Sequence, residues 1–201
     1  MTQSNPKFAV SESRLLPAIA ERWSPYLFDG RPVERTSVAA CLEAARWAAS
    51  SYNEQPWFFL LAHREDEAEF AKIVDCLLDA NQAWAKAAGV LMLTVVSRTF
   101  RRNGTPNRMA EHDLGLAVGN LSLQATSLGL AVHQMAGIVP SRIRQSFGIP
   151  EGFDPVTALA LGYAADPASA DGPLAERDRA ARNRKPLGEF VYQGNWNRPA
   201  F

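Results

Sequence analysis

The segment from Asp113 to Leu128 limits the possible folds of this chain more than any other feature. Apolar residues recur along it at the spacing of one helix face, and small residues fill most of the positions between them. The apolar positions are Leu114, Ala117, Val118, Leu121, Ala125 and Leu128, and the small ones are Gly115, Gly119, Ser122 and Thr126. A helix that is apolar or small nearly all round is buried. We therefore expect a central helix that stops at Gly129, because glycine readily adopts the left-handed conformation after a helix end.

Short apolar runs predict the strands that this helix would cover. The runs WFFLLA and VLMLTVV, at residues 57–62 and 90–96, are continuous and rich in aromatic or β-branched residues, as buried strands are. Further strands are predicted at 130–135 and 156–163. Helices are predicted from Leu15 to the Ser24-Pro25 break, over 36–49, over 70–78, and from a capping Ser141 to Gly148.

The order of these elements indicates the fold class. Strands and helices alternate, and two of the strand connections are single long helices. This order favours an α+β fold in which a mixed sheet of about four to five strands is sandwiched by helices. After Tyr163 the composition shifts to Ala, Asp, Pro and Arg, and a short apolar patch returns only at 186–192. We expect one domain, residues 1–201, in which residues 165–201 form an arm that docks on a second subunit.

Composition and charge exclude several classes of partner. The 201 residues include 21 Lys and Arg and 21 Asp and Glu, so the chain has no net charge that would attract nucleic acid or anionic lipid. No apolar run approaches the roughly 18 residues that span a bilayer, and the first residues lack the apolar core of a signal peptide. We expect a cytoplasmic protein. Cys41 and Cys76 are interpreted as small buried hydrophobes, with a disulfide or a reactive thiol as the alternative.

The common catalytic motifs are missing from the sequence. It contains no G-x-S-x-G, no H-E-x-x-H and no Walker A pattern. The three histidines, His63, His112 and His133, are scattered without cysteines or carboxylates at ligand spacing, so no metal site is predicted. No G-x-G-x-x-G follows a strand, which argues against a Rossmann-type nicotinamide site. The sequence therefore predicts no catalytic side chain of its own.

The tetrad Asn53-Glu54-Gln55-Pro56 lies between a predicted helix and a buried strand. Asn and Gln amides carry donors and acceptors on short side chains, and Pro56 restricts the entry to the strand. The group could bind the edge of a heteroaromatic ring that alternates N, N–H and C=O, as the pyrimidine part of a flavin does. Alternatively, Asn53 only shapes a turn that Gln55 caps.

Two sets of basic residues could bind anions. Arg22 with Ser24, and Arg182 and Arg184 with Lys185, offer guanidinium and hydroxyl groups suited to a phosphate, although basic runs are usually solvated. Residues 97–111 form a long loop without periodicity, either a lid or a solvated basic loop. Of its four arginines, Arg98, Arg101, Arg102 and Arg108, the first three are candidates for the 2′-phosphate of NADPH.

Four motifs together resemble the nitroreductase family of flavoproteins. The first is Arg22-Trp23-Ser24-Pro25, and the second is the string from Glu43 to Trp57 that ends in SSYNEQPW. The others are Asp113-Leu114-Gly115-Leu116-Ala117 followed by Asn120-Leu121, and Arg182-Asn183-Arg184-Lys185-Pro186-Leu187. The resemblance covers about residues 18–192, which is nearly the whole chain.

The resemblance implies an obligate homodimer with swapped C-terminal arms and two FMN sites at the interface. Carried over by position, Arg22, Trp23 and Ser24 would lie at the phosphate and ribityl chain. Arg182 and Arg184 would approach from either subunit, with Lys185 as the alternative if the register slips. Asn53 and Gln55 would face the pyrimidine edge, and the backbone of Ala136-Gly137 would lie near N5. The chain departs from the family at Tyr26, where a basic residue is usual, and at Ala136, where many members have Glu.

The implied activity is hydride transfer from NAD(P)H through flavin N5 to an electron-poor small molecule, such as a nitroaromatic or quinone, in a ping-pong cycle. The flavin would perform the chemistry and the protein would orient it. Candidates for the pocket wall are Asn81, Trp84 and Phe100, although Trp84 is better explained by core or dimer packing. The alternatives are a different flavin reaction, such as oxidation by O2 or flavin fragmentation, and a flavin-binding protein without turnover.

Overall fold

The computed structural model describes residues 5–201, and in this part of the chain four strands form one sheet. They are β1 (Trp57–His63), β2 (Val90–Ser97), β3 (Ala131–Met135) and β4 (Phe153–Gly162), in the spatial order β1-β2-β4-β3. All three neighbouring pairs are antiparallel. The strand positions confirm the prediction from the sequence, whereas the expected mixed sheet is wrong.

The reason for the antiparallel sheet lies in the place of β4. The long helix α5 (Ala110–Ser127) connects β2 to β3, and such a helical crossover returns the chain in the same direction. β2 and β3 do run in the same direction, but β4 lies between them and pairs antiparallel with both. The length of the connection between two strands indicates a helical crossover. It does not show whether a strand from later in the sequence lies between them in the sheet.

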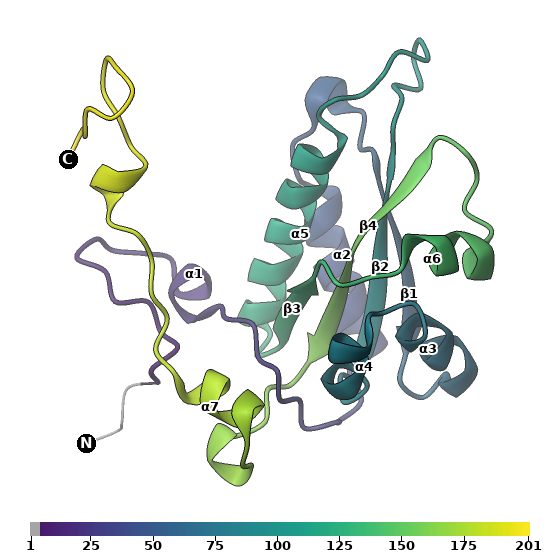
Figure 1. The fold of residues 1–201 in the computed structure, drawn as a ribbon, viewed down its shortest axis with the longest axis horizontal. Coiled ribbons are helices and arrows are strands. Elements are labelled where there is room, and N and C mark those ends of the chain that lie inside the picture. Colours follow the sequence, from purple (N-terminus) through teal and green to yellow (C-terminus); the bar gives the residue numbers. More distant parts are fainter. Residues whose placement is uncertain (1–4) are drawn as a thin grey trace.

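Helices cover both faces of the sheet, as expected (Figure 1). On one face lie α2 (Arg35–Arg46) and α5, and on the other lie α3 (Glu67–Val74), α4 (Asp79–Ala85) and α6 (Pro140–Phe147). β2 is buried along its whole length, and its side chains alternate between the two layers. Val90 and Met92 pack with α2 and α5, whereas Leu91 and Leu93 pack with the other three helices.

The central helix α5 is present, but it is buried on one side only. Ala117, Leu121 and Ala125 are fully buried against the sheet and α2, and Gly129 adopts the expected left-handed conformation with φ 73°. Leu116, on the opposite side, and Leu128, which follows the end of the helix, are each 41% exposed. A single copy of the chain therefore leaves part of the apolar surface of this helix open.

Several helix boundaries differ from those predicted. The first helix, α1 (Pro17–Glu21), is short, and α3 ends at Val74, so that Leu77 and Leu78 lie outside it. α6 begins at Pro140 with Val139 as its N-cap, not Ser141, because proline suits the first helical position, where no N–H is needed. Gly148 ends α6 as expected. The helices α4 and α7 (Pro173–Arg179) and the 3-10 turns Ser51–Asn53, Pro167–Ser169 and Leu187–Glu189 were not predicted.

The two ends of the chain run beside each other, away from the sheet (Figure 1). The carboxylate of Asp178, which is 1% exposed, accepts hydrogen bonds from the backbone amides of Tyr26 and Leu27. The guanidinium of Arg182 donates to the carbonyls of Ala20 and Arg22. In the C-terminal segment after Arg182, four large apolar side chains are exposed to solvent: Leu187, Phe190, Trp196 and Phe201. No helix within residues 5–201 is both long and apolar enough to cross a membrane.

The two cysteines are buried and free, which confirms their interpretation as small hydrophobes. Cys41 packs in the α2 and α5 layer, whereas Cys76 packs on the opposite face of the sheet. Burial raises the pKa of the Cys41 thiol to about 11. The position of the two residues in separate layers excludes a disulfide between them within one chain.

Candidate functional site

The turn from Ser50 to Pro56, between α2 and β1, has an unusual backbone. Tyr52, Asn53 and Gln55 have φ values of 54°, 56° and 52°. This left-handed conformation costs a residue other than glycine roughly 1–2 kcal/mol. Such strain persists only where the surrounding structure fixes it, and it is concentrated at functional sites.

Buried acceptors hold the strained turn in place. Asp113, in the first turn of α5 and 2% exposed, accepts a hydrogen bond from the Ser51 amide at 2.9 Å. The Ser50 hydroxyl accepts one from the Gln55 amide at 3.0 Å. Glu54 is 7% exposed and accepts one from the Arg101 amide at 2.7 Å. These roles of Glu54 and Asp113 were not predicted from the sequence, although an acidic residue at the start of an otherwise apolar helix is a signal that could have indicated the role of Asp113.

Exposure alternates along the turn. Glu54 and Pro56 are buried, whereas the side chains of Asn53 and Gln55 lie at the surface. The Gln55 side-chain amide donates to the Asn53 carbonyl at 3.0 Å, so part of its function is to shape the turn, as the alternative interpretation held. The Asn53 side-chain amide and the Gln55 side-chain oxygen are exposed on the same short segment and can contact a ligand.

The predicted phosphate-binding residues gather at the chain ends. Arg22 donates to the Ser24 hydroxyl at 3.3 Å, and Arg22, Arg182, Arg184 and Lys185 line one cavity of about 720 Å³. Burial lowers the pKa of Arg22, and the nearby charge of Arg184 lowers it further. Burial and the charges of both neighbours also lower the pKa of Arg182. These guanidinium groups destabilise one another, and a bound anion would remove that repulsion.

Trp23 does not line this cavity. The Lys7 Nζ lies 5.2 Å from the centre of its ring, and both residues line a second cavity, of about 600 Å³, together with Asp178 and Arg179. Trp23 also lines a third recess together with Arg22, so it remains close to one of the predicted phosphate-binding residues.

Ala136 and Gly137 directly follow the edge strand β3. The Gly137 carbonyl accepts hydrogen bonds from the Leu78 amide and from the Asn81 side chain, each at 3.0 Å. A Cβ atom at position 137 would lie 2.4 Å from the Asn81 Nδ2, so only glycine fits without a shift. Gly137 is thus packed against one pocket-wall candidate, Asn81, whereas Ala136 is exposed.

The other two pocket-wall candidates pack against aromatic rings. Trp84 is 5% exposed, and its ring centre lies 4.4 Å from that of His133 and 5.2 Å from that of Tyr26. Its position is that of a core residue, as the packing explanation held. Phe100 is 9% exposed and packs edge-on against Tyr52 in the strained turn.

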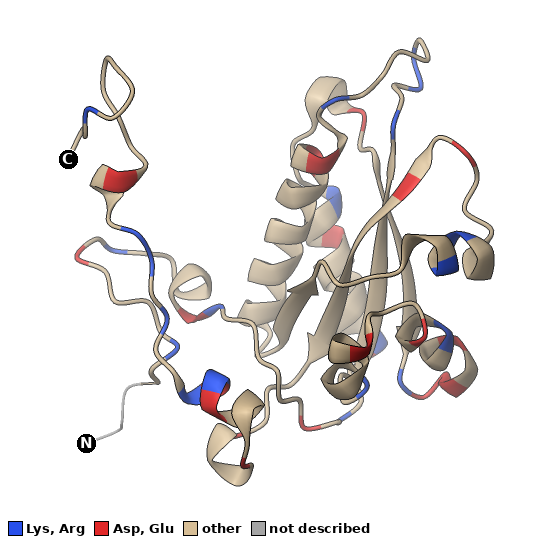
Figure 2. Cartoon of the chain, viewed as in Figure 1, with Lys and Arg blue, Asp and Glu red and all other residues tan. Residues whose placement is uncertain are grey.

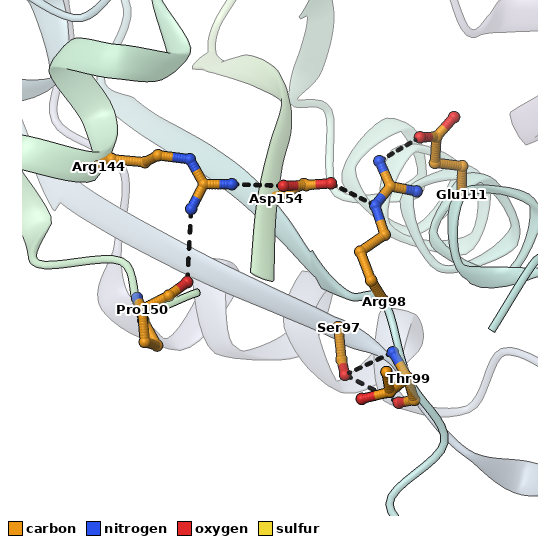
Figure 3. Close-up of polar contacts among 7 residues, drawn as sticks. All are labelled: Ser97, Arg98, Thr99, Glu111, Arg144, Pro150 and Asp154. Carbon is orange, nitrogen blue, oxygen red and sulfur yellow. Dashed lines mark hydrogen bonds and ion pairs between the residues drawn. The ribbon is translucent and has the colours of Figure 1, made fainter. Parts of the chain in front are cut away.

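The loop after β2 is tied down at its base. Arg98 pairs with Asp154 of β4 at 2.5 Å and with Glu111 of α5 at 2.6 Å, and Asp154 also pairs with Arg144 of α6 (Figure 3). These contacts raise the pKa of Arg98, chiefly through the hydrogen bond with Asp154. Arg98 therefore serves the structure of the loop while its side chain stays 39% exposed, and these two carboxylate contacts leave little of it for a nucleotide phosphate.

The turn that carries the amide pair and the Arg22 part of the basic cluster lie near opposite ends of α5. Asp113 holds the turn near the start of the helix, whereas Arg22 lines a recess with Thr126 and Gly129 near its end. The thirteen residue steps from Asp113 to Thr126 correspond to about 20 Å of α-helix. One chain thus does not bring the two groups of predicted residues into a common pocket. Nor do three His, Cys, Asp or Glu side chains of the described residues gather into a metal site.

Comparisons with known proteins agree with this architecture. A structure described as an oxidoreductase containing FMN superimposes with a TM-score of 0.88 at 35% identity, covering 98% of each chain. An uncharacterized 15.4 kDa protein of Mycolicibacterium smegmatis is 36% identical over 126 residues, which are 61% of this chain and 82% of that protein. An FMN and NADPH-dependent nitroreductase mutant from sphigopyxis sp. strain HMH has a TM-score of 0.68 at 21% identity, covering 89% of this chain and 98% of its own. The nitroreductase family profile matches residues 19–163, and the chain belongs to the nitroreductase family.

Proposed function

We propose that this protein is an FMN-dependent oxidoreductase that takes hydride from NAD(P)H and passes it to an electron-poor small molecule such as a nitroaromatic or a quinone. The observation that carries the proposal is the strained Ser50–Pro56 turn, which presents two amide side chains from a backbone fixed by buried carboxylates. The similar structure at 35% identity contains FMN, and the more distant nitroreductase is named for FMN and NADPH.

The donors and acceptors of the chain fit FMN. The Asn53 and Gln55 amides suit the alternating donors and acceptors of its pyrimidine edge. The Arg22, Arg182 and Arg184 cluster has the charge that a phosphate group needs, and the Ser24 hydroxyl adds a donor or acceptor. The exposed Ala136 gives a flat ring access to the backbone beside Gly137, whose own Cβ position is filled by the Asn81 side chain. Bound FMN supplies the hydride-accepting and hydride-donating N5 atom, while these residues hold and orient the ring.

The site requires two copies of the chain. Because the amide pair and the basic cluster lie at opposite ends of α5, a second copy packed on α5 would bring the turn of one chain to the cluster of the other. The outer side of α5 suits such packing: within the described chain, a Cβ at Gly115 or Gly119 would meet no heavy atom within 4 Å. Leu116 is exposed on this side, and α5 carries no Lys or Arg (Figure 2). Interface cores are depleted in charge in this way.

The exposed apolar residues of the C-terminal segment support the same proposal. Leu187, Phe190 and Trp196 are between 53% and 83% exposed in one copy. In a homodimer, residues 165–201 would dock on the partner, as an arm that carries Arg182 and Arg184 with it.

An assay of the FMN-loaded protein tests the activity. With NADPH and a quinone or nitroaromatic, we expect NADPH oxidation that depends on both the acceptor and FMN. Parallel initial-rate lines at several acceptor concentrations would indicate the ping-pong cycle. FMN-loaded protein that fails to oxidise NADPH with every quinone and nitroaromatic tested would contradict the proposal and favour a flavin-binding role or a different flavin reaction.

Mixing two inactive variants tests whether the site is shared. Arg22→Ala and Asn53→Ala each damage both sites of their own homodimer. In a mixed dimer, one shared site would carry both changes and the other would carry neither. We therefore expect mixing to restore about a quarter of the wild-type sites, since half of randomly paired dimers are mixed and each has one intact site. No recovery, with mixed dimers demonstrated by mass spectrometry, would place the whole site within one chain.

A further inference from the structure

The tip of the 98–107 loop contacts the strained turn through three consecutive residues. The Phe100 ring packs edge-on against Tyr52, with ring centres 5.8 Å apart. Arg101 contacts Glu54, and the Arg102 guanidinium lies 4.0 Å from the centre of the Tyr52 ring. The loop itself forms a small hairpin. The Phe100 backbone amide donates a hydrogen bond to the Thr105 carbonyl, and the Asn107 backbone amide donates one to the Arg98 carbonyl. Two segments that are far apart in the sequence thus form one unit.

Glu54 is the polar centre of this unit. Its Oε1 accepts a hydrogen bond from the Arg101 amide at 2.7 Å and lies 3.4 Å from the Arg101 Nε. Glu54 is 7% exposed, whereas the Arg101 side chain is 80% exposed. The buried backbone contact therefore determines the position of Glu54, and the solvated ion pair adds little to it.

The neighbours of Glu54 in the chain are the two predicted flavin contacts. Asn53 and Gln55 both have left-handed backbones, and a residue fixed between them controls the direction in which both side chains point. With Glu54 directed inward to Arg101, the amides on either side are directed outward. Without this anchor the turn can relax toward less strained conformations, and the amides would lose their alignment.

We propose that Glu54 is a positioning residue that couples the 98–107 loop to the flavin-binding amides, so that seating of the loop tip sets how Asn53 and Gln55 meet the flavin edge. This inference rests on the proposed FMN site. Glu54 acts through its neighbours and does not itself contact the flavin. The loop is thus part of the cofactor site through the turn, whether or not it also covers the pocket.

Three variants test the coupling in the full chain. Glu54→Ala removes the acceptor for the Arg101 amide, and Glu54→Gln keeps one. Glu111→Ala is the matched control, because it removes a carboxylate that pairs with Arg98 in the same loop but does not touch the turn. The measurements are the FMN dissociation constant from fluorescence quenching and the visible absorption and circular dichroism of the bound flavin, which report the hydrogen bonds at its pyrimidine edge.

We expect Glu54→Ala to weaken FMN binding by about tenfold and to change the flavin spectrum, while Glu54→Gln stays within about threefold and Glu111→Ala within about twofold of the wild type. In the FMN-free protein, hydrogen exchange at residues 51–55 should accelerate in Glu54→Ala alone. If Glu54→Ala does not fold, Glu54→Met, which retains most of the buried volume, takes its place in every measurement.

The outcomes separate the two proposals. A wild-type protein that binds no FMN overturns the proposed function. A wild type that binds FMN, with Glu54→Ala giving the same affinity and spectrum, overturns the positioning role and leaves the function intact. An equal loss of affinity in Glu54→Ala and Glu111→Ala would also overturn it, because the effect would then reflect general loosening of the loop.

Discussion

The carboxylate of Asp113 accepts a hydrogen bond from the backbone amide of Ser51 at 2.9 Å, across 62 residues of chain. This contact joins the start of the central helix to the strained turn that presents Asn53 and Gln55. It places the candidate cofactor contacts at a fixed position relative to the core, because α5 packs directly on the sheet.

Asp113→Ala tests the importance of this contact. Because Asp113 is 2% exposed, its removal leaves the Ser51 amide without its acceptor. We expect the free energy of unfolding to fall by about 1–3 kcal/mol in urea titrations. Glu151→Ala, at an exposed position, is the control and should stay within about 0.5 kcal/mol of the wild type. Equal stabilities of the two variants would show that the turn does not depend on Asp113.

Arg22→Ala tests the phosphate assignment. We expect FMN binding to weaken by about tenfold or more, because a charge-assisted contact with the phosphate is lost. Riboflavin, which lacks the phosphate, should bind the variant and the wild type equally. Arg14→Ala, an exposed arginine of the same segment, should leave both affinities unchanged. A parallel loss of riboflavin affinity would mean that Arg22 supports the fold and not the phosphate.

Gly119→Arg tests the interface on α5. The outer side of Gly119 is open in one copy, and arginine favours a helix interior over glycine by up to about 1 kcal/mol. The variant should therefore fold, and it should elute as a monomer with greatly weakened FMN binding. Gln145→Arg makes the same change of charge on exposed α6 and should leave the dimer intact. A Gly119→Arg protein that remains dimeric, as measured by light scattering, would exclude this face as the interface.

His133→Gln tests a pH dependence of stability. Burial lowers the pKa of His133, although the Pro25 carbonyl and the charge of Asp178 oppose the shift. Below about pH 6.5 the unfolded chain binds a proton at this site that the folded protein excludes, so stability should fall as the pH decreases through this window. The variant should lose less stability than the wild type between about pH 7 and pH 5.5. A His133→Gln protein whose stability falls with the same slope as that of the wild type would refute the assignment.

Much of the fold could be predicted because it depends on local patterns. The apolar runs that became β1 and β2 and the stripe of α5 follow the periods of strand and helix, and Gly129 and Gly148 act as helix ends as expected. Strand order was not predictable in this way. The insertion of β4 between β2 and β3 is a pairing between distant segments, and no local pattern encodes it.

In the candidate site, too, local patterns predicted some features, whereas contacts between distant segments determined others. The residue types at Asn53, Gln55 and Arg22 were recognisable, and the structure places the basic residues of both chain ends around one cavity. The left-handed backbone at Tyr52 and Gln55 was not foreseeable, because neither residue favours it and the cause lies in the distant Asp113 and Arg101. Trp84 lies on α4 and packs in the core. Its burial was hard to predict because α4 is too short to show a helical period.

The measurement that tests the central claim most directly is the visible absorption spectrum of the purified, FMN-reconstituted protein, followed by anaerobic addition of NADPH. We predict flavin bands that bleach as NADPH is added and return when a quinone or nitroaromatic follows. A protein that takes up no FMN, or one whose bound flavin stays oxidised in excess NADPH and in excess NADH, would contradict the account.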